Sequence, residues 1–508
     1  MQTIDWIVLA LYFLVLIGIG TWSIRQIHGS QDFFAAGGRM PWWLSGISHH
    51  VSGYSAVAFT GYAAVAYTEG FTLYVWWAVT VAIALFFGAI LIAPRWARLR
   101  RTYNIESPLE YLKTRYNVPT QQLLAWSGSL LKIFDVGAKY ASIAIFLDVL
   151  AGVPLYVGII LAGAVSLVYV TIGGLWADAW NDFAQFVIQV LATTILFVVV
   201  LAKLGGAGAI FGMWERLPEG HTSLFAGEYT PLFVLAFLFI TFLSYSGGTW
   251  NLAQRFIATP MGSDARKAAF LSAALYLTLP LVMFFPMWAA PIFFPDIGNP
   301  EEVYAIVARE FLPPGMVGLV LAGMFAATMS MTASDSNAVS AVITRDILPV
   351  VFRGLRNLSE ERGLLLGRIT TFLFTALTLL VAINAETFGG IIGLVVVWFA
   401  GLLGPTAIPM ILGLLPAFRH SGATAAIVST LAGVATFAVA NFVFQGPFAA
   451  TTGLPVVVSA VLFIGFGLLN RHKPVAPEVE GLLEALNEDQ AEPQPSPVTA
   501  ARGMERDS

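Results

Sequence analysis

Long apolar segments recur along this chain, separated by short polar ones. Segments of about 18 or more mostly apolar residues are typical of helices that cross a bilayer. They lie near residues 4–24, 43–67, 71–93, 122–150, 153–173, 180–203, 230–258, 266–294, 314–343, 365–384, 387–415, 421–443 and 452–470. This pattern predicts an all-α membrane protein with about 13 transmembrane helices.

The composition agrees with a membrane protein. Of the 508 residues, 57% are hydrophobic and 11% are charged, whereas soluble domains average about 25% charged residues. The absence of cysteine excludes disulfides, thiol catalysis and cysteine metal sites. No basic region precedes the first apolar run, so we expect a membrane helix there rather than a cleaved signal peptide.

Basic residues in the loops predict the orientation. Loops that follow odd-numbered helices contain Arg25, Arg39, Arg95, Arg98, Arg100, Arg101, Lys113, Arg115, Arg266, Lys267, Arg353, Arg356, Arg362, Arg419, Arg471 and Lys473. Because such residues concentrate on the cytoplasmic side, we expect a multi-pass protein of the cell membrane with its N-terminus outside and its C-terminus in the cytoplasm. We also expect residues 471–508 to form a disordered cytoplasmic tail, with a short helix near 478–487.

Two of the apolar spans contain polar, glycine-rich centres. One is Gly46-Ile-Ser-His-His-Val-Ser-Gly-Tyr-Ser55, and the other is Leu243-Ser-Tyr-Ser-Gly-Gly-Thr-Trp250. Small residues also allow close helix packing, but interrupted helices in two halves of a membrane protein are typical of a transporter's binding site. If the two are equivalent, helices 2–6 (about 43–203) and 7–11 (about 230–415) form inverted five-helix repeats within a transporter domain of residues 1–470. Helices 1, 12 and 13 are then peripheral, and access to the site alternates between the two sides.

Several motifs resemble those of a known family. They are Gly37-Gly-Arg-Met-Pro-Trp-Trp43, Gly173-Gly-Leu175, Gln254-Arg255 and the stretch from Phe325 to Asn337. Together they resemble the sodium:solute symporter family, which includes sodium/sugar, proline and sialic acid cotransporters, over about residues 5–470. The resemblance implies a leucine-transporter-type fold and a non-enzymatic symporter that takes a small polar organic solute into the cell. Sodium is then the coupling ion, with no organic cofactor and no nucleic-acid partner.

The resemblance also implies a sodium site between the first broken helix and helix 9. Its ligands would be the carbonyls of Val51, Tyr54 and Ala327 and the hydroxyl of Ser330. Hard cations take oxygen ligands, and an unwound helix supplies free carbonyls. The family's second hydroxyl is replaced by Met331, whose thioether is a poor sodium ligand, so proton coupling stays open.

A second cation site is implied at Asp182 and Ser334. Carboxylates inside a membrane are costly and usually functional. Asp182 is expected near the start of its helix, however, where N-terminal capping would also explain an aspartate.

Candidate substrate contacts lie on helix 4 and around the two breaks. Lys132, Asp135 and Lys139 are spaced to share one helical face. They form either a structural cluster or a site whose surplus positive charge favours a small carboxylate-bearing solute. The further candidates are Ser52, Ser55, His50, Trp77, Thr249, Asn251 and Tyr276.

The positions that bind substrate in known relatives differ here. Trp77, Thr249 and Tyr276 stand where sugar-transporting relatives use a glutamate, an asparagine and a lysine. Ala138 stands where the sialic acid transporters use an arginine, with Lys139 one residue on. The alternatives are a proton-coupled or sugar symporter of the same fold and a transporter-like sensor. A membrane enzyme using His49, His50 and Asp135 lacks a nucleophile motif or metal-binding spacing.

Overall fold

The computed structural model describes residues 2–487 except 228, 357, 385–402 and 446–447, and every regular element in these residues is a helix. The α-helices are α1 (Thr3–Ser23), α2 (Ser30–Ala35), α3 (Trp42–Val51), α4 (Gly61–Glu69), α5 (Thr80–Leu91), α6 (Ala93–Tyr103), α7 (Leu112–Arg115), α8 (Val118–Ala151), α9 (Leu155–Lys203), α10 (Ala209–Gly212), α11 (Pro231–Leu243), α12 (Trp250–Ile257), α13 (Gly262–Phe293), α14 (Val303–Phe311), α15 (Met316–Val342), α16 (Leu348–Val351), α17 (Glu360–Ile383), α19 (Gly404–Leu412), α20 (Ala423–Ala438), α21 (Phe448–Leu469) and α22 (Pro477–Ala485).

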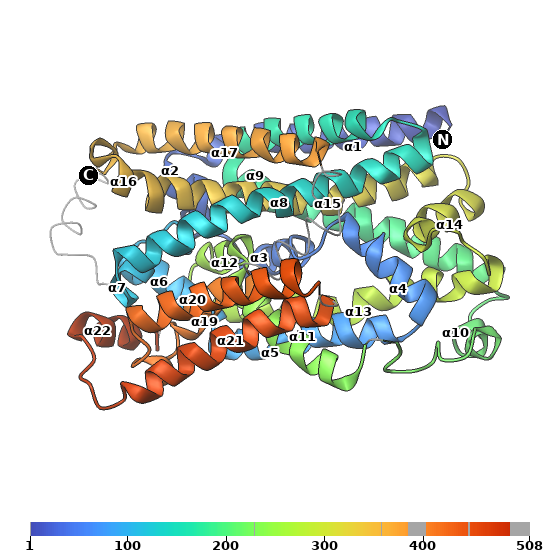
Figure 1. The fold of residues 1–508 in the computed structure, drawn as a ribbon. Helices are drawn as coiled ribbons and strands as arrows, with labels where there is room; N and C mark the ends of the chain where they lie inside the picture. The colour runs from blue at the N-terminus through green and yellow to red at the C-terminus, as the bar shows by residue number, and fades with distance from the viewer. Residues whose placement is uncertain (1, 228, 357, 385–402, 446–447, 488–508) are drawn as a thin grey trace.

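The long helices run roughly along one direction and enclose the short helices α3 and α12 (Figure 1). Eight helices in the described part of the chain are long and apolar enough to cross a membrane. The predicted all-helical class is confirmed, whereas the number of 13 helices and the repeat boundaries stay predictions. Most of the predicted span 387–415 lies outside the described residues.

The first predicted break is present. Helix α3 ends at Val51 and α4 begins at Gly61, with one short 3-10 turn between them. Side chains from distant helices bind the backbone that this break frees. Tyr276 donates to the carbonyl of His50 at 2.9 Å, Tyr245 to that of Gly53 at 2.9 Å and Asn251 to that of Ser52 at 3.2 Å. These bonds replace those that a continuous helix would make.

The second predicted break is also present. After α11 the chain forms a π-helical segment over Ser244–Gly248, and Thr249 is extended before α12 begins. Gly247 has a φ of +119°, which only glycine adopts readily. The indole nitrogen of Trp96 donates to the carbonyl of Ser246 at 2.9 Å and thereby holds the break from the side.

We expect Gly247→Ala to lower the stability of the protein by about 1–3 kcal/mol, because a non-glycine residue is strained in this conformation. An added Cβ would also lie 2.6 Å from the indole nitrogen of Trp96. Thermal unfolding in detergent would measure the loss. Gly61→Ala is the control at the other break, where the nearest atom would be 3.7 Å away. Equal unfolding midpoints for both variants would contradict the strain at Gly247.

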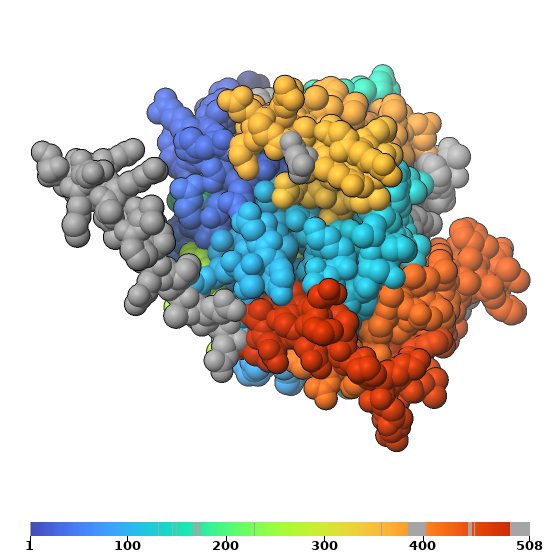
Figure 2. All heavy atoms as spheres, turned by 90° about the vertical axis from the view of Figure 1, so that its left-hand side faces the viewer, coloured from blue at the N-terminus to red at the C-terminus, as the bar shows by residue number. Residues whose placement is uncertain are grey.

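One end of the molecule carries most of the basic loops. Helices α6, α7, α16 and α22 gather there, whereas α10 and α14 lie at the opposite end (Figure 1). Figure 2 views the basic end directly and shows α22 lying over the segments that precede α8. This arrangement agrees with basic loops that share one side.

The described part of the tail contains a helix where the sequence predicts one. Helix α22 forms within the predicted range, and its Val479, Leu482 and Leu483 are buried. The guanidinium of Arg98 donates to the carbonyl of Leu486 at 2.8 Å. Burial of its apolar face stabilises α22 against the rest of the molecule.

A buried acidic cluster joins the basic-end loops. Glu110 accepts hydrogen bonds from the backbone N–H groups of Glu106 and Ser107, at 2.9 and 2.8 Å. Arg345 lies 3.6 Å from a carboxylate oxygen of Glu106 and 3.5 Å from one of Glu110. Burial, only partly offset by Arg345, raises the pKa of the Glu106 carboxyl from 4.5 to about 7.

Stability should therefore fall as pH rises towards neutrality. Because folding raises the pKa of Glu106, its contribution is complete below about 4.5 and is lost as pH rises through about 7. We expect Glu106→Gln to flatten the dependence of the unfolding midpoint on pH between these values. Glu361→Gln, at an exposed position of α17, is the control. A slope that persists in Glu106→Gln would assign the titration to another group.

Candidate functional site

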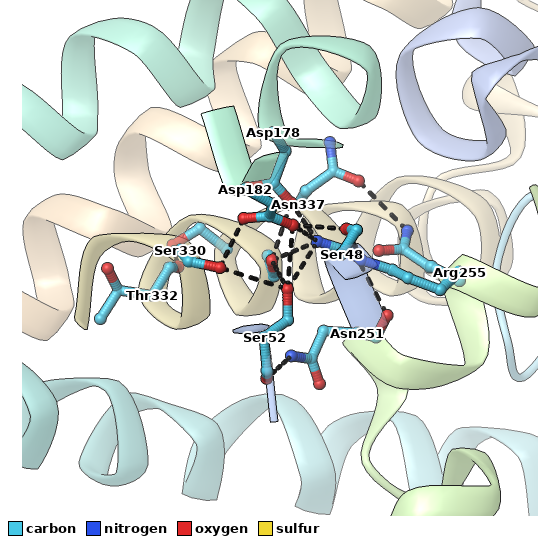
Figure 3. A network of polar contacts seen from close by, with 12 residues as sticks. Ser48, Ser52, Asp178, Asp182, Asn251, Arg255, Ser330, Thr332 and Asn337 are labelled. Carbon is cyan, nitrogen blue, oxygen red and sulfur yellow. Dashed lines mark hydrogen bonds and ion pairs between the residues drawn. The ribbon is translucent and has the colours of Figure 1, made fainter. Parts of the chain in front are cut away.

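Asp182 is the centre of a buried polar network between α3, α9, α12 and α15 (Figure 3). Its carboxylate accepts hydrogen bonds from Ser330 at 2.5 Å, from Ser52 at 3.1 Å and from Ser48. The guanidinium of Arg255 lies 3.1 Å from the same carboxylate. The network joins both broken helices to α9 and α15.

The expectation that Asp182 begins a helix is wrong. Helix α9 breaks at Gly174, which has non-helical backbone angles, and Asp182 lies about two turns beyond it. Its side chain binds other helices rather than its own N–H groups. Capping therefore does not explain this aspartate.

Arg255 lies where the resemblance implies a second cation. Its guanidinium is 2.6 Å from the carboxylate of Asp178 and 3.1 Å from that of Asp182. It also donates to the hydroxyls of Ser334 and, at 3.0 Å, Ser52. The predicted second-site residues Asp182 and Ser334 thus both contact an arginine.

The residues predicted for the main sodium site lie on two facing segments. Ser52 and Ser330 have their hydroxyl oxygens 3.3 Å apart, and the N–H of Ala56 donates to Thr328 of α15 at 3.1 Å. Tyr54 lies between Ser52 and Ala56 in the sequence, Val51 directly precedes Ser52, and Ala327 directly precedes Thr328.

The carbonyl groups at this break fall into two sets. Those of His50, Ser52 and Gly53 accept side-chain hydrogen bonds. In the part of the chain that the structure describes, the carbonyls of Val51 and Tyr54 accept none. Two carbonyl oxygens of the break are therefore free of hydrogen bonds, and oxygen is the ligand that a hard cation such as sodium takes.

Lys132, Asp135 and Lys139 of α8, the predicted helix 4, form a closed cluster with Asp335 of α15. Lys132 lies 2.9 Å from Asp135 and 2.5 Å from Asp335, and Lys139 lies 2.7 and 2.6 Å from the same two carboxylates. The expectation of surplus positive charge is wrong, because Asp335 of α15 balances the second lysine. Such a buried arrangement is strongly destabilised when one member is removed.

A cavity of about 90 Å³ lies beside the first break. Its lining residues are Gly53, Tyr54, Ser55, Val57, Ala58, Tyr62, Asp135, Lys139, Ser244, Tyr245, Thr249, Leu252 and Met331. Of the predicted substrate residues, Ser55, Asp135, Lys139 and Thr249 are among them. Met331 lines this cavity too, together with Tyr54 of the predicted ion site.

The other predicted substrate residues do not line the cavity. His50, Trp77 and Tyr276 are buried behind it as an aromatic wall, with 4.4 Å between the ring centres of His50 and Tyr276 and 5.8 Å between those of Trp77 and Tyr276. Ser52 belongs to the Asp182 network, and Asn251 binds the carbonyl of Ser52. These residues support the site rather than face the cavity.

Sequence reasoning missed several members of the site. Asp178, Arg255 and Ser48 belong to the Asp182 network, and Tyr62 and Tyr245 line the cavity. Arg255 had a usable signal, since it lies within the predicted span 230–258 and charged residues there are costly and usually functional, whereas Asp178 lies between the predicted spans 153–173 and 180–203. The tyrosines had none, because aromatic residues are frequent throughout these helices.

Two interrupted helices that face a polar network and a small cavity define a membrane transporter by fold and site. The family model of the sodium:solute symporter family matches residues 33–433. The chain belongs to the sodium:solute symporter family.

Relatives and solved structures agree with this family. The chain is 26% identical to the sodium/sialic acid symporter of Aliivibrio fischeri, over 85% of this chain and 87% of the relative. It is 27% identical to the sodium/glucose cotransporter of Vibrio parahaemolyticus, over 68% of each. Its fold is similar to that of a Na⁺-coupled sialic acid symporter in a substrate-bound outward-open state, with a TM-score of 0.81, 20% identity and coverage of 94% and 99%.

Proposed function

We propose that this protein couples the inward movement of sodium to the uptake of a small polar organic solute. The observation that carries the proposal is the pair of free carbonyls at Val51 and Tyr54 in the first break, where the hydroxyl of Ser52 lies 3.3 Å from that of Ser330 of α15. Sodium bound there would join the unwound part of the first broken helix, between α3 and α4, to α15. Because transport requires these two segments to separate and rejoin, ion binding and solute access become linked.

The proposed orientation places the basic end in the cytoplasm. This assignment rests on the basic loops, and it puts the N-terminus outside the cell. Helices α3 and α12 are then the cytoplasmic halves of the two broken helices. Movement of these halves away from α9 and α15 would open the site inwards.

We propose that the solute bears a carboxylate. The supporting observations are the sialic acid and monocarboxylate transporters among the relatives and the presence of Lys139 at the cavity. The pairing of Lys139 with Asp135 and Asp335 limits this attraction. A sugar is the second candidate, supported by the hydroxyl-rich lining at Ser55 and Thr249 and by the glucose cotransporter among the relatives.

Uptake into proteoliposomes tests the proposal. An inward sodium gradient should drive the accumulation of the transported solute, found by screening sugars, amino acids and organic acids for sodium-dependent thermal stabilisation. Uptake driven by a pH gradient alone would show that the coupling ion is a proton and not sodium. Solute binding with no accumulation would favour a sensor.

Lys139→Gln separates the two substrate classes. If the ammonium contacts a carboxylate, the apparent KM for the acid should rise by about ten-fold or more, the value of one hydrogen bond to a charged group. The KM for a neutral analogue should change much less. An equal rise for both would assign Lys139 to the structural cluster.

A further inference from the structure

The charges around Asp182 do not balance. Arg255 bridges Asp178 and Asp182 at 2.6 and 3.1 Å, and the three side chains are at most 1% exposed. With both carboxylates ionised, one positive charge faces two negative charges, which leaves a net charge of minus one. The neighbouring cluster of Lys132, Lys139, Asp135 and Asp335 has two charges of each sign and is neutral.

A buried charge without a partner is expensive, so the Asp182 network favours one further cation. The oxygen atoms for it are present. The Oδ1 atom of Asp182 accepts a hydrogen bond from the hydroxyl of Ser330 at 2.5 Å. Among the described residues, the Oδ1 atom of Asp178 is buried and has no hydrogen-bond partner.

The position of Arg255 decides how many cations can enter. Its Nη2 atom contacts both carboxylates and the hydroxyls of Ser52 and Ser334. A second free cation would have to share these oxygens with the guanidinium and would meet its charge at close range. Arg255 contacts Oδ2 of Asp182, whereas Oδ1 of Asp182 binds Ser330 and Oδ1 of Asp178 has no hydrogen-bond partner among the described residues.

We propose that Arg255 is a tethered cation that limits this site to one sodium ion. Asp178 holds the guanidinium in place, and Asp182 keeps the charge that the sodium ion neutralises. The inference rests on the proposed sodium coupling and goes beyond it by fixing the ion number and assigning roles to Asp178 and Arg255. The number of bound sodium ions should then equal the net negative charge of Asp178, Asp182 and Arg255 together.

Equilibrium binding of ²²Na⁺ to the purified protein tests this ion number without transport. The wild type should bind one sodium ion per protein. Asp178→Asn makes the network neutral, and its sodium affinity should fall at least ten-fold. Arg255→Gln makes the net charge minus two, and two ions should bind. The double variant restores minus one and should bind one ion again.

A matched control uses the ion pair of exposed Arg39 and partly buried Asp32, whose charged atoms are 2.7 Å apart outside the network. Arg39→Gln and Asp32→Asn should leave sodium binding unchanged. If Arg255→Gln does not fold, the other two variants still test the inference. Asp178→Asn should bind sodium more weakly than the wild type, and the double variant should bind one sodium ion.

Two ions in the wild type, or one ion with unchanged affinity in all four proteins, would overturn the inference. A wild type that binds no sodium and takes up solute with a pH gradient would instead overturn the proposed sodium coupling. The two failures are therefore distinguishable.

Discussion

Asp182→Asn is expected to remove most of the sodium dependence of uptake. The carboxylate gathers hydroxyls from Ser48, Ser52 and Ser330 and lies 3.1 Å from Arg255. Asparagine has nearly the same size but no charge and only one acceptor oxygen. A hydrogen bond to a charged group contributes about 1.5–3 kcal/mol, so the sodium concentration for half-maximal uptake should rise by about ten- to a hundred-fold.

The measurement is solute uptake into proteoliposomes as a function of sodium, together with ²²Na⁺ binding. Asp148→Asn is the control, because this aspartate is exposed near the end of α8. A variant at 182 that keeps the wild-type sodium dependence would make Asp182 a structural clamp between helices. The coupling ion would then bind elsewhere.

Asp335→Asn is expected to destabilise the protein by about 3–5 kcal/mol, because removing one partner leaves a buried charge uncompensated. Asp335 lies 2.5 Å from Lys132 and 2.6 Å from Lys139, and its side chain is fully buried. Asparagine would leave two ammonium groups to share Asp135. Thermal unfolding, followed by size-exclusion chromatography in detergent, would measure the loss.

A compensating variant separates charge from packing. Asp335→Asn combined with Lys132→Gln restores neutrality, and most of the lost stability should return. Lys132→Gln alone should also destabilise the protein, because it leaves the cluster with one negative charge in excess. If the double variant is as unstable as the sum of both single variants, the loss comes from packing rather than from unpaired charge.

The sequence alone determined the parts of this structure that depend on local chemistry. Apolar segments long enough to cross a bilayer had to form helices, because only a helix satisfies its own backbone groups in an apolar medium. The breaks near Ser52–Ser55 and Ser246–Thr249 followed from glycine and serine within those segments. The family motifs were likewise readable in order along the chain.

Local pattern was wrong about Asp182. The predicted span 180–203 placed this residue at a helix start, although α9 already resumes after Gly174. The pattern predicted the helix near 478–487 but did not indicate that α6 and α7 cover its apolar face.

Only the tertiary structure decided which charges meet. Lys139 and Asp335 are 196 residues apart, and Arg255 and Asp182 are 73 apart. Helical periodicity specifies which residues share a face of one helix, but not which face of another helix lies opposite. The neutrality of the Lys132 cluster and the net negative charge around Asp182 therefore arise from the packing of α8, α9, α12 and α15, which brings these distant residues into contact.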